Sequence, residues 1–200
     1  MDEHIRFMPK PSNREKILTE GLRVVHERGF GGASVRDIVQ AAGVPQGSFT
    51  NHFTSKEAFG LEILDLYYAG GQEIIRDTLL NDSLPPLKRL RAYIDFNKTR
   101  LNQDGLRNGC LLGNFTAEAG DHSDAIRERL GVIFVEVQQS IAYCLKAAVV
   151  AGELPADFAC DDVANFVISS LQGAILLGKV QRSLAPLERF KKVLFSMVLR

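Results

Sequence analysis

The chain has 200 residues, 46% of them hydrophobic, and its 24 basic and 24 acidic side chains give a formal net charge of zero at pH 7. Bulk charge therefore cannot attract nucleic acid, and any contact with DNA must come from a local set of donors. This length and hydrophobic content allow one substantial core with a small domain attached to it.

The first 15 residues are mixed in charge and contain no apolar segment of the kind found in a signal peptide. No later stretch approaches the roughly 18 uninterrupted apolar residues that are typical of a membrane helix. We therefore expect a cytoplasmic protein with no membrane partner.

Apolar residues recur with a period near 3.6 along almost the whole chain, whereas alternating strand patterns are missing. The sequence thus predicts an all-α fold with eight or nine helices. The first helix is expected from Asn13 to Arg28, because Ser12 and Glu15 have the spacing of a capping box and Gly29 can end the helix.

Two short helices joined by a tight turn are predicted next. Ser34 can cap the first, Gly43 can form the turn, and Pro45 suits the first turn of the second. Six apolar residues can form their common core: Ile38, Val39, Ala42, Val44, Phe49 and Phe53. The hydrogen-bonding side chains left to point outward are Arg36, Gln46, Ser48, Thr50, Asn51 and His52. This is the organisation of a helix-turn-helix, whose second helix reaches base edges in the major groove.

A longer helix is expected after Ser55. Its mid-helix Gly70 and Gly71 indicate either that a neighbouring helix packs closely there or that the helix bends, and we favour close packing. Five further helices are expected over residues 85–103, 110–119, 123–151, 162–177 and 186–197. The seventh has an apolar stripe that advances by three and four residues: Ile126, Leu130, Ile133, Val137, Ile141, Cys144 and Ala148.

The segment ILTEGLRVVHERGFGGA at residues 17–33, with the run SVRDIVQAAGVPQGSFTNHFTSKEAF that follows it, resembles the TetR family of bacterial repressors. The resemblance implies a three-helix DNA-binding domain over residues 1–56 and a larger helical domain for ligand binding and dimerisation over residues 57–200. It implies a base or phosphate contact for Arg36 and phosphate contacts for His52 and Lys56. Recognition-helix contacts are implied for Gln46, Ser48, Thr50 and Asn51. The family usually has a tyrosine where this chain has Thr50, so that backbone contact is absent or moved to Asn51.

On this likeness we expect a ligand-responsive repressor that is released from an inverted-repeat operator on double-stranded DNA by an unknown small molecule or electrophile. We expect a homodimer in which the eighth and ninth helices pair as a four-helix bundle, because both helices carry more apolar residues than one core face needs. No cofactor is expected. The alternative is a constitutive DNA-binding protein without an inducer.

The three cysteines, Cys110, Cys144 and Cys160, form no C-x-x-C pair and make an odd count. This argues against both a disulfide framework and a structural zinc site, so reduced thiols and no metal are expected. The run RNGCLLGNF is similar to a segment in the branch of the family that includes the repressor of N-ethylmaleimide reductase, which implies electrophile sensing by Cys110. The alternative is that Cys110 is a small buried hydrophobe.

A helical enzyme is the remaining alternative. The string EAGDHSD brings Glu118, Asp121, His122 and Asp124 together, and carboxylates beside a histidine can bind metal or transfer protons. A turn between two helices with an N-cap explains the same string without chemistry. We therefore expect no enzyme and no catalytic residue.

Overall fold

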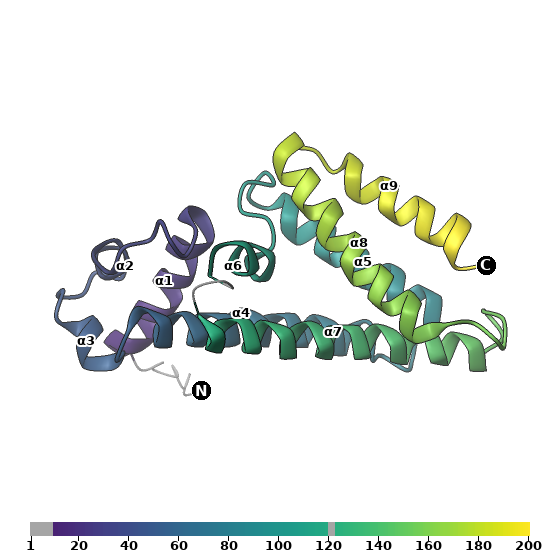
Figure 1. Cartoon of the computed structure of the whole chain (residues 1–200), viewed down its shortest axis with the longest axis horizontal. Coiled ribbons are helices and arrows are strands. Elements are labelled where there is room, and N and C mark those ends of the chain that lie inside the picture. Colours follow the sequence, from purple (N-terminus) through teal and green to yellow (C-terminus); the bar gives the residue numbers. More distant parts are fainter. Residues whose placement is uncertain (1–9, 120–122) are drawn as a thin grey trace, which may run out of the picture. The chain divides into compact units, whose positions relative to one another are not determined.

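The computed structural model describes residues 10–119 and 123–200, and every regular element in those ranges is helical (Figure 1). The predicted all-α fold is confirmed. The helices are α1 (Asn13–Arg28), α2 (Val35–Ala41), α3 (Ser48–His52), α4 (Lys56–Asp77), α5 (Pro86–Asn102), α6 (Leu111–Ala119), α7 (Asp124–Val150), α8 (Cys160–Gln181) and α9 (Ala185–Val193), which continues into the π-helical turn η1 (Leu194–Val198).

The described residues divide into two compact units between Ile63 and Leu64, within helix α4. The first unit contains α1, α2, α3 and the beginning of α4. The second unit contains the rest of α4 and all later helices.

Serine caps fix where the first two helices begin. At α1, the Glu15 backbone N–H donates to Ser12 Oγ over 3.2 Å and the Ser12 N–H donates to Glu15 Oε2 over 2.7 Å, which confirms the predicted capping box. Helix α2 has a second one between Ser34 and Asp37. The hydrogen bonds that these serines donate lower the pKa of each carboxyl. Arg28 also reaches Asp37 over 2.9 Å and links the end of α1 to the start of α2.

An aromatic cluster forms the centre of the first unit. The rings of Phe49, Phe53 and Phe59 lie with their centroids 5.1–5.2 Å apart. Five of the six predicted core residues are buried, and Val44 is half-buried. Gly21 allows the close approach of α1 to this cluster, because a Cβ atom there would lie 2.4 Å from Phe59 Cζ.

The second unit is built around α7, which packs against α5, α6 and α8. Ser123 caps α7 by accepting the Ile126 N–H over 3.1 Å. All seven residues of the predicted apolar stripe are buried. Helix α9 packs against α8 and α5, with ion pairs from Lys98 to Glu188 and from Lys191 to Asp95. Helix α8 begins at Cys160, two residues before the expected start.

By length and composition alone, α7 and α8 could each cross a membrane, and the core helices of soluble proteins have the same property. The sequence criterion counted uninterrupted apolar runs and did not detect these two helices. Because α7 and α8 pack against each other and against further helices, their composition is also that of a helical core.

The expectation of close packing at Gly70 and Gly71 is wrong. Among the atoms of the described residues, a Cβ on Gly70 would meet none within 4 Å, and one on Gly71 would meet only Tyr68 Cδ2 of the same helix, at 3.7 Å. Helix α4 nevertheless runs through both glycines from Lys56 to Asp77. The two glycines therefore weaken the helix without allowing a neighbouring helix to pack more closely.

Replacing Gly21 by alanine should destabilise the first unit, because the new methyl group overlaps the fully buried ring of Phe59. Overpacking of this kind costs about 1–3 kcal/mol. Urea denaturation followed by circular dichroism measures the loss. Gly70→Ala is the matched control and should raise stability by up to about 1 kcal/mol, since its methyl group meets open space. An unchanged midpoint for Gly21→Ala would contradict the proposed role of the contact.

Candidate nucleic-acid interface and internal cavity

Helices α2 and α3 and the turn between them form a helix-turn-helix. The Gly43 N–H donates to the Gln40 carbonyl over 3.1 Å, and the Val44 N–H donates to the Val39 carbonyl over 3.2 Å. Gly43 has a φ of +63°, a left-handed conformation that glycine adopts without strain. The turn is thus closed by its own backbone and depends on this glycine.

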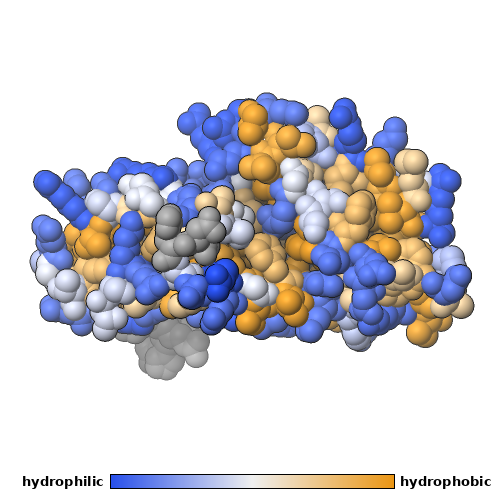
Figure 2. Space-filling model, viewed as in Figure 1, coloured by the Kyte–Doolittle hydropathy of each residue, from blue (hydrophilic) through white to orange (hydrophobic). Residues whose placement is uncertain are grey.

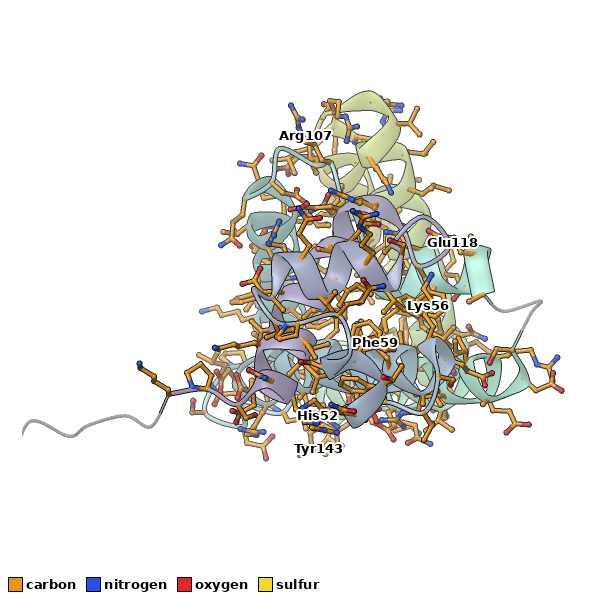
Figure 3. All side chains as sticks on the ribbon, turned by 90° about the vertical axis from the view of Figure 1, so that its left-hand side faces the viewer. His52, Lys56, Phe59, Arg107, Glu118 and Tyr143 are labelled. Atoms are coloured by element: carbon orange, nitrogen blue, oxygen red, sulfur yellow. The ribbon has the colours of Figure 1, made fainter. Side chains whose placement is uncertain are left out.

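Most of the predicted contact residues lie on the surface of this motif. Arg36 is exposed at the start of α2 and makes no hydrogen bond or ion pair with another described residue. Gln46 is exposed in the turn, and Asn51 and His52 are exposed on α3. The His52 ring also lies edge-on to Phe53, with the centroids 6.5 Å apart. The exposed polar side chains thus belong to the same unit as the buried aromatic cluster, of which Phe59 is labelled with His52 in Figure 3.

Two predicted contact residues in α3 differ from the expectation. Ser48 is only 8% exposed, because α3 packs against α1 and α2 and its first residue is covered by that contact. The expectation that Ser48 points outward is therefore wrong. Thr50 is exposed, and its hydroxyl donates to the Gly47 carbonyl over 3.1 Å. That bond ties the hydroxyl to its own helix.

Lys56, at the start of α4, has a partner within the first unit. Its ammonium donates to the Phe30 carbonyl over 2.6 Å and lies 4.8 Å from the centroid of the Phe30 ring. Lys56 therefore holds the loop after α1 as well as lying near the helix-turn-helix in sequence (Figure 3).

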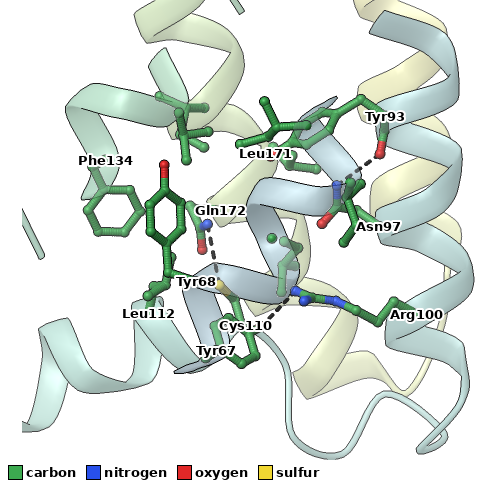
Figure 4. A pocket seen from close by; sticks show the side chains of 16 residues that line it. Tyr67, Tyr68, Tyr93, Asn97, Arg100, Cys110, Leu112, Phe134, Leu171 and Gln172 are labelled. Carbon is green, nitrogen blue, oxygen red and sulfur yellow. Dashed lines mark hydrogen bonds between the residues drawn. The ribbon is translucent and has the colours of Figure 1, made fainter. Parts of the chain in front are cut away.

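The second unit contains an internal cavity of about 50 Å³, bordered by α4, α5, α6, α7 and α8 (Figure 4). Its lining is mostly apolar, with a few polar side chains among aliphatic and aromatic ones. The lining residues are Tyr67, Tyr68, Gly71, Ile74, Ile75, Tyr93, Asn97, Arg100, Cys110, Leu112, Phe134, Val137, Ile168, Leu171, Gln172 and Ile175.

The polar lining groups are connected by hydrogen bonds. Arg100 Nη2 donates to the Tyr67 hydroxyl over 2.6 Å, and its guanidinium carbon lies 4.8 Å from the Tyr67 ring centroid. Gln172 Nε2 donates to Cys110 Sγ over 3.5 Å, and Asn97 Nδ2 donates to the Tyr93 carbonyl over 2.8 Å (Figure 4). An apolar pocket with a few convergent polar groups is typical of a small-molecule site.

Burial keeps the phenols of this cavity protonated. The pKa of Tyr93 is raised to about 12, mainly by desolvation and also by the neighbouring Cys110, while Arg100 and the hydrogen bond with Asn97 act in the opposite direction. The pKa of Tyr67 is also raised well above its ordinary value, mainly by burial and then by Cys110, while Arg100 lowers it. Both phenols are therefore neutral hydrogen-bonding groups at physiological pH.

Cys110 lies immediately before α6 and is 8% exposed. It borders both the cavity and a surface groove of about 380 Å³, and the two spaces also share Phe134, Gln172 and Ile175. Cys144 donates to the Pro86 carbonyl over 3.1 Å, and burial raises its pKa to about 11. Cys160 is buried as well. Cys110 is thus the cysteine that lies on a wall between two open spaces.

Helices α8 and α9 expose apolar residues over much of their surface, and hydrophobic residues gather over these helices (Figure 2). Phe166 is 47% exposed, Leu176 62%, Leu177 52% and Val180 75%. A groove of about 430 Å³ runs between the two helices. Packing within one chain thus leaves a large part of the apolar surface of these two helices exposed.

The acidic string considered for catalysis lies partly outside the described residues, since Asp121 and His122 are not among them. Glu118 lies exposed on α6. In residues 10–119 and 123–200, no group of three or more His, Cys, Asp or Glu side chains could hold a metal ion.

Sequence reasoning missed the polar lining of the cavity. Tyr93, Asn97 and Arg100 follow one another at i, i+4 and i+7 along α5, and the buried Ile94 and Leu101 lie beside them. Polar residues at helical spacing within a buried face were the available signal, because such residues require partners or a ligand.

Two families match this chain. Residues 17–63 match the bacterial regulatory proteins of the tetR family, and residues 86–194 match the tetracyclin repressor-like C-terminal domain. Together the two matches cover most of the first unit and most of the second.

Several known proteins are similar over most of the chain. The HTH-type transcriptional repressor DhaR of Mycobacterium sp. strain GP1 is 40% identical over 96% of this chain and 95% of its own. The crystal structure of regulatory protein TetR from Rhodobacter sphaeroides has a TM-score of 0.86 at 31% identity, covering 90% of this chain and 96% of that one. The reduced form of the Escherichia coli protein NemR has a TM-score of 0.81 at 29% identity, covering 89% and 92%.

Proposed function

The chain belongs to the TetR family of DNA-binding transcriptional regulators, and from this premise we propose that it is a repressor released from an inverted-repeat operator by a small molecule or electrophile. The observation that carries the proposal is the combination in one chain of a helix-turn-helix with an exposed polar surface and a partly polar internal cavity. We assign DNA binding to residues 1–56, and effector binding and dimerisation to residues 57–200. A regulator of this kind acts in the cytoplasm.

The DNA contacts come from exposed side chains of the helix-turn-helix. The guanidinium of Arg36 is exposed and has no partner among residues 10–119 and 123–200, so it is available to a guanine edge or a phosphate. Gln46, Thr50, Asn51 and His52 supply the remaining contacts at and beside α3. The Lys56 ammonium already donates to the Phe30 carbonyl, so a phosphate contact would use another of its N–H groups.

The partner in the dimer is a second copy of this chain, joined through α8 and α9. The exposed apolar residues on these helices, with Val180 at 75% exposure, support a four-helix bundle. A two-fold axis also relates two recognition helices to two half-sites about 34 Å apart, which is why we expect an inverted repeat.

Effector binding releases DNA by a shift between two dimer conformations, only one of which fits the operator. Helix α4 is the proposed lever, because it contributes Phe59 and Ile63 to the first unit and Tyr67 and Ile75 to the cavity of the second. A coupling free energy of about 1–3 kcal/mol would weaken DNA binding about 5- to 150-fold. A constitutive DNA-binding protein, the alternative, would bind its operator equally well with and without added small molecules.

A second candidate is that the signal is covalent modification of Cys110. Its place on the wall between the surface groove and the cavity favours this, since a reagent in the groove would reach the thiol. The competing role is packing, supported by its low exposure and its bond from Gln172. The two roles differ in their response to electrophiles.

Replacing Arg36 by alanine should weaken binding to a duplex carrying a binding site mapped with the purified protein. If Arg36 reads a guanine, the loss is about 1–3 kcal/mol and preference relaxes at one base pair. Lys56→Ala should weaken binding to all duplexes alike. It should also reduce the slope of the logarithm of the binding constant against the logarithm of the salt concentration by about one. Arg23→Ala is the control, because Arg23 is already paired with Glu20 and Glu27. Equal losses for Arg36→Ala on specific and scrambled duplexes would reassign this residue to the backbone.

The homodimer should appear in light scattering as twice the monomer mass at micromolar concentration. Val180→Glu places a charge on the exposed apolar face of α8. This substitution should raise the dissociation constant of the dimer at least tenfold. Glu128→Gln, on an exposed position of α7, is the control and should remain dimeric. A monomer mass for the unmodified chain would exclude this assembly.

If Cys110 is the sensor, the Cys110→Ser protein should stay on its binding site when a maleimide or quinone releases the unmodified protein. Fluorescence anisotropy of a labelled duplex measures the release. Cys160→Ser is the control and should be released like the unmodified chain. Equal release of all three proteins would remove Cys110 from the mechanism and leave a reversible ligand.

A further inference from the structure

Arg100 is the only charged side chain among the described residues that line the cavity. It is half-buried and makes no ion pair, since no carboxylate of the described residues lies within 4 Å of it. A single hydrogen bond, to the Tyr67 hydroxyl, engages one of its five N–H donors. A partly desolvated guanidinium with spare donors is stabilised by an anion.

The size of the cavity limits what that anion can be. Its volume is about 50 Å³, well below the roughly 300–1,000 Å³ of pockets that hold drug-sized ligands. A nucleotide, a coenzyme thioester or an aromatic drug is larger than this. The space fits a molecule of a few non-hydrogen atoms.

We propose that the cavity binds a short-chain monocarboxylate of two to four carbons, whose carboxylate pairs with Arg100 and whose carbon chain lies against the apolar lining. The inference rests on the proposed effector role of the second unit and names the class of effector.

The rest of the lining suits the two ends of such a molecule. The planar fork of Arg100 matches a carboxylate, which it can hold with two parallel hydrogen bonds. Tyr67 and Tyr93 stay protonated there, so they add no negative charge that would repel the ligand. Val137, Ile168 and Leu171 supply apolar surface for the carbon chain.

The surface groove lies on the other side of Cys110 from the cavity. Lys179 lines this groove, and its ammonium lies 3.4 Å from Asn114 Oδ1. Glu118 also lines the groove, so its net charge is not strongly positive. Because Cys110 and Gln172 border both spaces, a movement of their side chains would open a path from the groove to Arg100.

Isothermal titration without DNA tests the inference with three pairs of probes, each matched in size: acetate and acetamide, propionate and propionamide, butyrate and butyramide. At constant ionic strength, at least one carboxylate should bind at least tenfold more tightly than its amide. Arg100→Gln should weaken that carboxylate about 10- to 150-fold, the usual range for a hydrogen bond to a charged group. Arg91→Gln, on the exposed side of α5, is the control and should bind like the unmodified chain.

Three results would overturn the inference: no binding by any carboxylate, equal binding of carboxylates and amides, or unchanged binding by Arg100→Gln. Circular dichroism checks that Arg100→Gln is folded. If it is not, Arg100→Lys keeps the charge and should still prefer the carboxylate over its amide, although more weakly than arginine. Release of operator DNA is measured separately. Carboxylates that bind without releasing DNA would leave this site in place and count against the proposed effector role, whereas release by some other molecule would do the reverse.

Discussion

One uninterrupted helix, α4, supplies core residues to the first unit and cavity residues to the second. Five of its residues follow one another at intervals of four and so lie along one slowly turning face: Phe59, Ile63, Tyr67, Gly71 and Ile75. The first two are buried in the core of the first unit, and the last three border the cavity of the second. A break in the helix would separate these two roles, because backbone hydrogen bonds are what keep the face continuous.

This face also gives a physical account of the glycine at position 71. Each mid-helix glycine costs roughly 1 kcal/mol relative to alanine, and no neighbouring backbone approaches either glycine of α4. Gly71 borders the cavity, however, so a larger side chain there would occupy space that is now open. If the cavity binds the proposed effector, the helix gives up stability at this position and keeps room for that molecule, as functional sites often do.

Local spacing was enough to predict the helix-turn-helix. The caps of α1 and α2 and the turn at Gly43 all depend on residues within four positions of one another, and such signals are visible in a single sequence. The burial of Ser48 depends on α1 and α2 covering α3, which no local pattern reveals. The cavity could not be predicted from the sequence for the same reason, since residues from five helices line it. Its only trace in the sequence is the polar series Tyr93, Asn97 and Arg100 within a buried face.

The exposed apolar surface of α8 and α9 links the abundance of the protein to its stability. If two copies bury this surface against each other, unfolding separates them, and the free energy of unfolding then rises with protein concentration. A scarce chain would spend more time with Leu176 and Val180 in water, where apolar patches favour aggregation and proteolysis. Expression level would then set not only how often an operator is occupied but how long each newly made chain survives.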